Sequence, residues 1–169
     1  MRFHIAHIDN LRKLYVDQVQ HLHSAEAQII EALPKLVEAA ADPELKQALQ
    51  THLEQTREQL SRVRQILDET AGTPEPKKNK PIAAMIDEGN DMIDDSKNDS
   101  VRDASIIAVC QRIEHYEIAA YGTVHNFAEI IGETDQATLL DKTLDEEKNA
   151  DELLTSISDF ANTRADRAA

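Results

Sequence analysis

Three long amphipathic segments of this sequence place carboxylates on the apolar stripe that would face a protein core. The carboxylates on these stripes are Glu26, Glu117, Glu147 and Asp151. An ionised carboxylate buried without a partner is so costly that it normally takes up a proton instead. Several of them aimed at one core therefore predict a positive partner, and a metal ion is the leading candidate. The alternatives are protonation, pairing with a basic side chain, or a Glu at the stripe's margin that reaches water.

The spacing of the carboxylates lets more than one oxygen reach a shared ion. Glu147 and Asp151 are four residues apart and align with the leucines of their own segment, which is the clearest pattern in the chain. Glu114 and Glu117 are three residues apart on neighbouring ridges, with Glu117 nearer the centre of the stripe. Tyr121 follows one turn later. We expect it to pack, and a hydrogen bond to a ligand is the alternative.

His52 is the natural nitrogen ligand for such a site. It shares the inward face of its segment with Thr56 and Gln59, in register with apolar residues. A single histidine on a core face is commonly a hydrogen-bonded structural residue, so both roles stay open. Carboxylate oxygens with one imidazole suit iron or manganese, less specifically magnesium or calcium, and disfavour copper(I) or a structural zinc.

Other charged residues of the same segments are expected to face solvent. Glu146 and Glu152 fall outside the stripe of their segment, and Glu54 and Glu58 lie on the far face of theirs. His115 points away from the carboxylate stripe. The sequence has no Gly-rich phosphate loop and no nucleophile with a base at motif spacing, so it does not indicate an enzyme of either type.

The composition favours helices as the elements that position these residues. Charged residues make up 30% of the chain and aromatic residues 4%, with no Trp and four Gly. Such a composition is typical of long helices rather than strands, so an all-α fold is expected. The length of 169 residues predicts a single domain over 1–169.

The charge balance favours cations as partners. With 18 basic and 32 acidic residues the formal net charge is −14, so nucleic acid and anionic membranes are poor partners. Cys110 is the only cysteine, which excludes an intrachain disulfide and zinc–thiolate or iron–sulfur sites. No apolar run approaches the length of a membrane span and the N-terminus lacks the apolar core of a signal peptide. A cytoplasmic location is therefore expected.

Apolar periodicity divides the chain into four long helices and one short one. The predicted helices cover residues 10–41, 43–71, 81–95, 101–131 and 134–162. Short turns join the first two and the last two, and a long crossover carries the short helix on the outside of the bundle. An antiparallel four-helix bundle with one long crossover is the connectivity of ferritin-like folds, in which inward Glu and His side chains build dinuclear sites.

Capping residues mark the ends of these helices. Asp9 or Asn10 starts the first helix, Asp42 before Pro43 starts the second, and Gly132 ends the fourth.

The crossover has capping signals of its own. Gly72 and residues 73–76 are predicted to close the second helix, and the lysine-rich residues 77–80 to form a loop. The stretch from Ser100 to Asp103 resembles a capping box with Asp in place of Glu, which would open the next long helix.

Four motifs together resemble the YciF-like DUF892 stress-response family of the ferritin-like superfamily. They are YVDQVQHLHSAEAQI, HLEQTREQLSRV, VRDASIIAVCQRIEHYEIAAYGTV and LDEEKNADELL, and EHYEIAAYGT is the most specific part. The resemblance covers nearly the whole chain. It implies a bacterial homodimer with a di-iron or dimanganese centre, a role in stress responses, and catalase-like decomposition of hydrogen peroxide.

The resemblance also implies a set of metal ligands. Carried over residue by residue, the ligands would be Glu26, Glu114, Glu117, Glu147 and Asp151, together with His52.

The sequence departs from the wider superfamily at the Glu-x-x-His ligand pair. None of its seven histidines has a Glu three residues before it. Glu54 is instead followed three residues later by Arg57, whose fixed positive charge is predicted either to weaken a second metal position or to neutralise an empty carboxylate cluster. The alternative function is therefore a metal-free structural or interaction protein of the stress response. Iron storage ranks lower, because a mineral cavity needs a large closed shell.

Overall fold

The computed structural model describes residues 7–70 and 77–167, which form five helices and contain no strand. The helices are α1 (Leu11–Ala39), α2 (Pro43–Thr70), α3 (Lys80–Asp95), α4 (Asp99–Ile131) and α5 (Thr134–Asp166). The expected all-α class is confirmed. The largest difference from the predicted boundaries is at α5, which continues four residues further; α1 ends two residues earlier and α4 begins two residues earlier than predicted.

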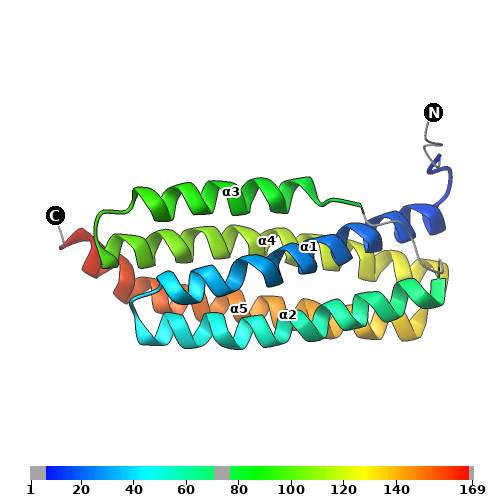
Figure 1. Cartoon of the computed structure of the whole chain (residues 1–169). Helices are drawn as coiled ribbons and strands as arrows, with labels where there is room; N and C mark the ends of the chain where they lie inside the picture. The colour runs from blue at the N-terminus through cyan, green and yellow to red at the C-terminus, as the bar shows by residue number, and fades with distance from the viewer. Residues whose placement is uncertain (1–6, 71–76, 168–169) are drawn as a thin grey trace, which may run out of the picture.

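The four long helices lie side by side as a helical bundle (Figure 1). α1 and α2 run in opposite directions on either side of a tight turn, as do α4 and α5. α4 and α5 form the most extensive helix pair, and α1 packs on both α2 and α4. α3 lies along the outside against α4 and α1, where the crossover was expected to carry it.

Three of the predicted caps are present. The side chain of Asn10 accepts a hydrogen bond from the amide of Lys13, and Asp42 accepts from the amides of Glu44 and Leu45. All three bonds satisfy amides at a helix start that have no partner within the helix. Gly132 ends α4 with φ at 82°, in the left-handed region where a side chain would be strained.

The predicted loop at residues 77–80 is one residue too long. Lys80 begins α3, because the side chain of Asn79 caps the helix by accepting from the amide of Ile82. The predicted end of α2 at Gly72 and residues 73–76 lies outside the described residues.

The predicted capping box at Ser100 to Asp103 is wrong. Asn98 caps α4 instead, accepting from the amide of Val101. Asp103 is buried and reaches across to the turn between α1 and α2, where it accepts from the amides of Ala41 at 2.8 Å and Asp42 at 3.0 Å. A carboxylate that looked like a local cap therefore ties α4 to another part of the chain.

The apolar core forms two clusters, one toward each end of the bundle. One contains Ile29, Leu33, Leu45, Leu49, Ile106, Ile113 and Leu154. The other contains Tyr15, Leu22, Val63, Tyr121, Leu140 and Leu144. Along α1, Leu22 belongs to one cluster, Ile29 to the other, and the buried Glu26 stands between them. On the other long helices, too, buried polar residues lie between residues of one apolar cluster and residues of the other. Buried polar side chains therefore form a layer across the middle of the bundle.

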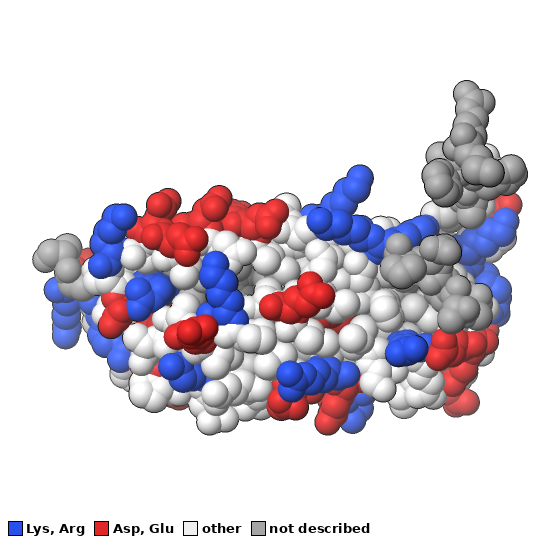
Figure 2. All heavy atoms as spheres, viewed as in Figure 1, with Lys and Arg blue, Asp and Glu red and all other residues white. Residues whose placement is uncertain are grey.

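The acidic excess is most concentrated on α3 in the view of Figure 2. The acidic residues of that helix are Asp87, Glu88, Asp91, Asp94 and Asp95, and all are exposed. Within the two described stretches, none of the helices combines the length and the apolar character that crossing a bilayer requires.

Candidate metal centre

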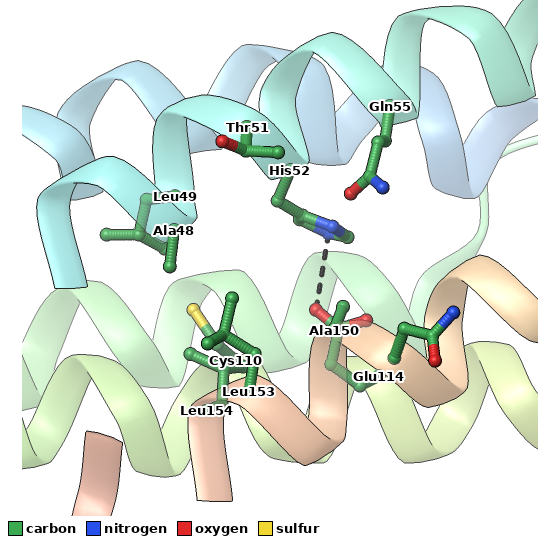
Figure 3. A pocket seen from close by; sticks show the side chains of 11 residues that line it. Ala48, Leu49, Thr51, His52, Gln55, Cys110, Glu114, Ala150, Leu153 and Leu154 are labelled. Atoms are coloured by element: carbon green, nitrogen blue, oxygen red, sulfur yellow. Dashed lines mark ion pairs between the residues drawn. The ribbon is translucent and has the colours of Figure 1, made fainter. Parts of the chain in front are cut away.

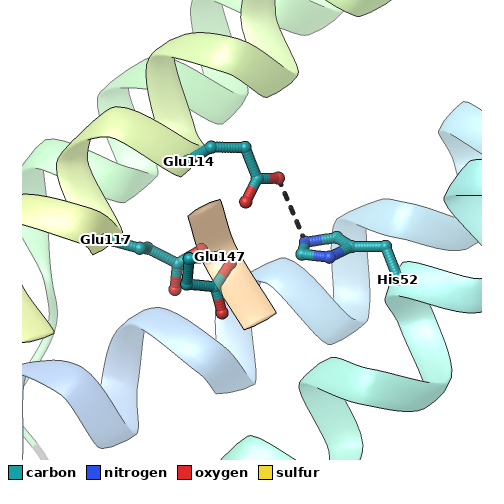
Figure 4. A group of neighbouring side chains, drawn as sticks. All are labelled: His52, Glu114, Glu117 and Glu147. Atoms are coloured by element: carbon teal, nitrogen blue, oxygen red, sulfur yellow. Dashed lines mark ion pairs between the residues drawn. The ribbon is translucent and has the colours of Figure 1, made fainter. Parts of the chain in front are cut away.

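Four buried side chains of metal-ligating type meet in the polar layer (Figure 4). His52, Glu114, Glu117 and Glu147 each offer one ligand atom, and these atoms all lie within 4.8 Å of one another. The side chains come from α2, α4 and α5, and two of them are three residues apart on α4. Helical periodicity explains that pair, since residues three apart share one face of a helix.

Glu26 adjoins this group from α1. Its side chain is fully buried, and one of its oxygens accepts a hydrogen bond from the hydroxyl of the equally buried Tyr121. Tyr121 therefore packs in the core and also holds the carboxylate of Glu26 by a hydrogen bond, so both expected roles are present.

Asp151 lies one helical turn beyond Glu147, outside the four-residue group. Its Oδ2 lies 3.1 Å from Nε2 of His115, whose side chain is 69% exposed. Its Oδ1 is buried without a hydrogen-bond partner among the described residues. His115 faces away from the core, as predicted, and bridges α4 to α5 at the surface.

Burial and mutual repulsion make the carboxylates of the centre weak acids. Burial first, and the charge of Glu147 second, raise the pKa of both Glu26 and Glu114 well above the usual value. Burial followed by the charges of Glu26 and Glu147 raises the pKa of Glu117 in the same way. Burial raises the pKa of Glu147 to about 7. Without a cation, several of these groups stay protonated at neutral pH.

His52 is a neutral imidazole at physiological pH. Burial lowers its pKa to about 4. Its Nε2 lies 3.2 Å from Oε1 of Glu114, and its Nδ1 has no hydrogen-bond partner in the described part of the chain. A neutral imidazole is the form that binds metal ions.

The centre holds more unsatisfied acceptors than a protein interior normally tolerates. Among the described residues, Glu26, Glu114 and Glu117 each have one buried carboxylate oxygen without a hydrogen-bond partner. Within the same residues, both oxygens of Glu147 are buried and without a partner as well. Buried polar atoms are nearly always hydrogen-bonded, so such a group needs an explanation. Carboxylate oxygens converging with an imidazole nitrogen fit a cation between them, and this donor set suits iron or manganese.

A partly buried ion pair borders the centre on one side. The guanidinium of Arg62 donates to both oxygens of Glu146, at 2.6 and 3.0 Å, and to the hydroxyl of Thr143 at 3.1 Å. Gln59 donates to the same carboxylate at 3.2 Å. The side chains of Arg62 and Glu146 are only 10% and 18% exposed.

Two predictions about charged residues near the centre are wrong. Glu146 does not face solvent, because Arg62 on α2 holds it between α2 and α5. Arg57 does not bring a positive charge to the centre, because it is 52% exposed and pairs with Glu54 on the outer face of α2. The one available indication in the sequence was that Arg62 lies three residues after the inward-facing Gln59.

Fold and centre together define an all-α bundle protein with a buried cluster of carboxylates around one imidazole. The model of the family described as "Domain of unknown function (DUF892)" matches residues 10–167. The chain belongs to the DUF892 family, as the motifs of the sequence indicated.

Similar proteins span nearly the whole chain. Protein YciF of Escherichia coli (strain K12) is 38% identical over 150 residues, which cover 88% of this chain and 90% of that protein. The crystal structure of the E. coli stress protein YciF superposes with a TM-score of 0.87 at 34% identity, covering 92% of this chain and 99% of that one. YcfI of Rhodopseudomonas palustris, for which a structural role has been proposed, superposes with a TM-score of 0.86 at 35% identity, covering 90% and 98%.

Proposed function

We propose that this chain is a ferritin-like metal-binding protein of the stress response, holding iron or manganese in the middle of an antiparallel four-helix bundle. The observation that carries the proposal is the buried group of His52, Glu114, Glu117 and Glu147, whose ligand atoms lie within 4.8 Å of one another. A bound cation would remove the repulsion and desolvation that otherwise force these carboxylates to stay protonated.

The proposed ligands divide into an inner group and two flanking carboxylates. His52, Glu114, Glu117 and Glu147 form the inner group. Glu26 flanks them with a buried, unpartnered Oε2, and its other oxygen is held by Tyr121. Asp151 offers its buried Oδ1 one helical turn beyond Glu147, within the described residues. Five carboxylates supply enough oxygens for the two ions of a dinuclear centre of the ferritin-like kind.

The stress-response role and the action on hydrogen peroxide rest on the family. One relative is described as a stress protein. Bound iron or manganese would supply the electron transfer that peroxide breakdown requires. The chain's own residues would hold the ions, orient Glu26 through Tyr121, and keep the surroundings dry by the apolar clusters on either side of the polar layer.

Metal content is the decisive measurement. We expect the protein purified from medium supplemented with iron and manganese to hold about two equivalents of one of these metals per chain. Substituting both Glu117→Gln and Glu147→Gln removes two inner carboxylates, and metal affinity should fall by more than about tenfold. Mass spectrometry of the dialysed proteins measures the bound metal.

The matched control substitutes Glu129→Gln and Glu152→Gln, which lie exposed on the same two helices. It should keep the metal content of the unsubstituted protein. Equal metal in all three proteins would place the ions elsewhere. An absence of iron and manganese from the folded, unsubstituted protein would remove the proposal.

A metal-free structural protein is the second candidate. It is favoured by the structural role proposed for the Rhodopseudomonas palustris relative and by the partly buried Arg62–Glu146 pair, in which a carboxylate beside the centre is satisfied without metal. This candidate predicts that a chelator leaves the unfolding temperature unchanged. The metal-binding proposal predicts that the chelator changes it, because ions bound only to the folded state stabilise that state.

A further inference from the structure

A cavity of about 120 Å³ lies between α2, α4 and α5 beside the metal centre (Figure 3). Its lining runs from exposed residues at the surface, Thr51, Asn149 and Leu153, to buried residues inside. The buried residues at its inner end include His52 and Glu114. The cavity therefore connects the molecular surface with two of the proposed metal ligands.

A second, smaller cavity lies on the other side of these ligands, toward α1 and α3. Its volume of about 30 Å³ is close to that of one water molecule. His52, Cys110 and Glu114 line both cavities. These three side chains form the wall between the cavity open to the surface and the interior against α3.

The inner end of the larger cavity presents polar atoms without partners on an otherwise apolar lining. Nδ1 of His52 and Oε2 of Glu114 are buried and have no hydrogen-bond partner in the described stretches. Both residues are at least nine-tenths buried as side chains. Around them lie apolar groups such as Leu49 and Leu154. An occupant that hydrogen-bonds at its inner end and is otherwise surrounded by apolar atoms would satisfy this site.

The charges around the cavity select against ions. Anions are repelled by the net charge of −14 and would lose their hydration on entering an apolar lining. Hydrated cations would have to lose water against an apolar lining, and Thr51, Gln55 and Asn149 toward the outer end carry no charge to replace it. The larger cavity, at about 120 Å³, has room for a molecule somewhat larger than water.

We propose that this cavity binds a small uncharged molecule with hydrogen-bonding groups and admits it to His52 and Glu114. The occupant enters between α2 and α5 and comes to lie against the side chain of Cys110. Its passage onward to a bound metal rests on the proposed function, whereas binding in the cavity does not.

Cys110 is a built-in reporter of this binding. It is the only cysteine of the chain, is 4% exposed, and lines the cavity. Methanethiosulfonate reagents convert a thiol to a mixed disulfide, releasing methanesulfinate and the thiol proton, and the added mass is read from the intact protein. Burial raises the pKa of this thiol to about 12, so the reactions are slow and are compared at one alkaline pH.

The reagents differ in charge and size. Small neutral methyl methanethiosulfonate should modify Cys110 in the metal-free folded protein at least about tenfold faster than its anionic sulfonatoethyl and cationic trimethylammonioethyl analogues, because ions must be desolvated to enter. Each rate is divided by that of a free thiol with the same reagent. Equal normalised rates, or a faster cationic reagent, would overturn the proposal, and the second result would indicate an entry route for metal ions.

A substitution that fills the cavity shows whether the reagent reaches Cys110 through the cavity or only when the protein unfolds. Ala150→Leu adds bulk to the α5 wall and should slow the neutral reagent several-fold, whereas Ala119→Leu, at an exposed position on α4, should not. If the reagent reached Cys110 only through unfolding, a destabilising substitution would speed modification rather than slow it. An unchanged or increased rate in the Ala150→Leu variant would therefore overturn the proposed route. Because this test uses protein without metal, its outcome is independent of whether the metal-binding proposal holds.

Discussion

The Arg62–Glu146 pair lies beside the candidate metal centre. Its two hydrogen bonds of 2.6 and 3.0 Å are parallel and join planar groups, which is the strongest geometry for such a pair. The charge of Glu146 raises the pKa of the adjacent Glu147, and that of Arg62 lowers it. The pair thus adds one positive and one negative charge beside the carboxylates of the centre.

Removing the arginine should destabilise the protein. Arg62→Met leaves a partly buried carboxylate without its charged partner, and we expect the free energy of unfolding to fall by about 2 to 3 kcal/mol. Arg62→Met combined with Glu146→Met should recover most of the loss, because no uncompensated charge remains. Urea denaturation of the metal-free proteins measures both. The control, Arg57→Met, removes an exposed guanidinium that pairs only at the surface and should change stability little. A loss as large in the control would argue against burial as the cause.

At the scale of helices, Asp103 joins the start of α4 to the turn between α1 and α2. Its two oxygens accept from two consecutive backbone amides. Asp103→Ala leaves both amides in a partly buried place without their acceptor, and we expect the free energy of unfolding to fall by about 3 kcal/mol. Asp103→Asn keeps one acceptor oxygen and should lose less.

Hydrogen exchange can locate the effect of this substitution. The amides of Ala41 and Asp42 should exchange faster in the Asp103→Ala variant, while those in the middle of α5 keep their protection relative to global stability. Asp141→Ala, at an exposed position of α5, is the control for removing an acidic residue. Unchanged exchange at Ala41 and Asp42 would mean that Asp103 does not hold this turn.

Periodicity predicted the parts of the structure that depend on one helix at a time. Glu26, Glu117 and Glu147 are buried because each stands on the apolar face of its own helix, and that face can be found from spacing alone. Asn10, Asp42 and Gly132 mark helix ends for equally local reasons.

Contacts between helices could not be predicted in this way. Asp103 meets its partners 61 and 62 residues away, and Arg62 meets Glu146 84 residues away. Spacing along one helix identifies its buried face but not which residue of another helix lies opposite. Single-helix patterns therefore located the centre but not the charges that border it.

At the scale of the molecule, the two apolar clusters contain most of the buried residues, and the polar layer between them holds Glu26, Glu117 and Glu147. The single domain, the cytoplasmic location and the homodimer stay predictions. The exposed Leu153 and Phe160 lie seven residues apart along α5 and would be the first positions to substitute in a test of self-association.

The polar layer should make the stability of the metal-free protein fall as pH rises. The pKa of Glu147 is about 7 in the folded protein against 4.5 for an ordinary Glu, and those of Glu26, Glu114 and Glu117 are also raised. Between pH 4.5 and 7, Glu147 has released its proton in the unfolded chain but keeps it in the folded protein. The stabilisation is therefore complete below about pH 4.5 and is lost as pH rises through 7, at a cost on the order of 3 kcal/mol for Glu147 alone.

His52 acts in the opposite direction. Its pKa is lowered from 6.5 to about 4, so its contribution is lost as pH falls through that range. The four carboxylates outnumber it, and a net fall in stability with rising pH is expected. Urea unfolding in a chelator at pH 5, 6, 7 and 8 measures the slope.

Metal should abolish or reverse this slope. Metal ions compete with protons for the same oxygens, so binding strengthens as pH rises and stabilises the folded state most where the metal-free protein is weakest. Adding manganese should therefore raise the free energy of unfolding much more at pH 8 than at pH 5. The Glu117→Gln and Glu147→Gln double variant should show a shallower slope without metal and little response to manganese, because two of the groups that exchange protons for metal are gone. A metal-free protein whose stability is flat or rises over this pH range would contradict the burial of protonated carboxylates, on which the description of the centre depends.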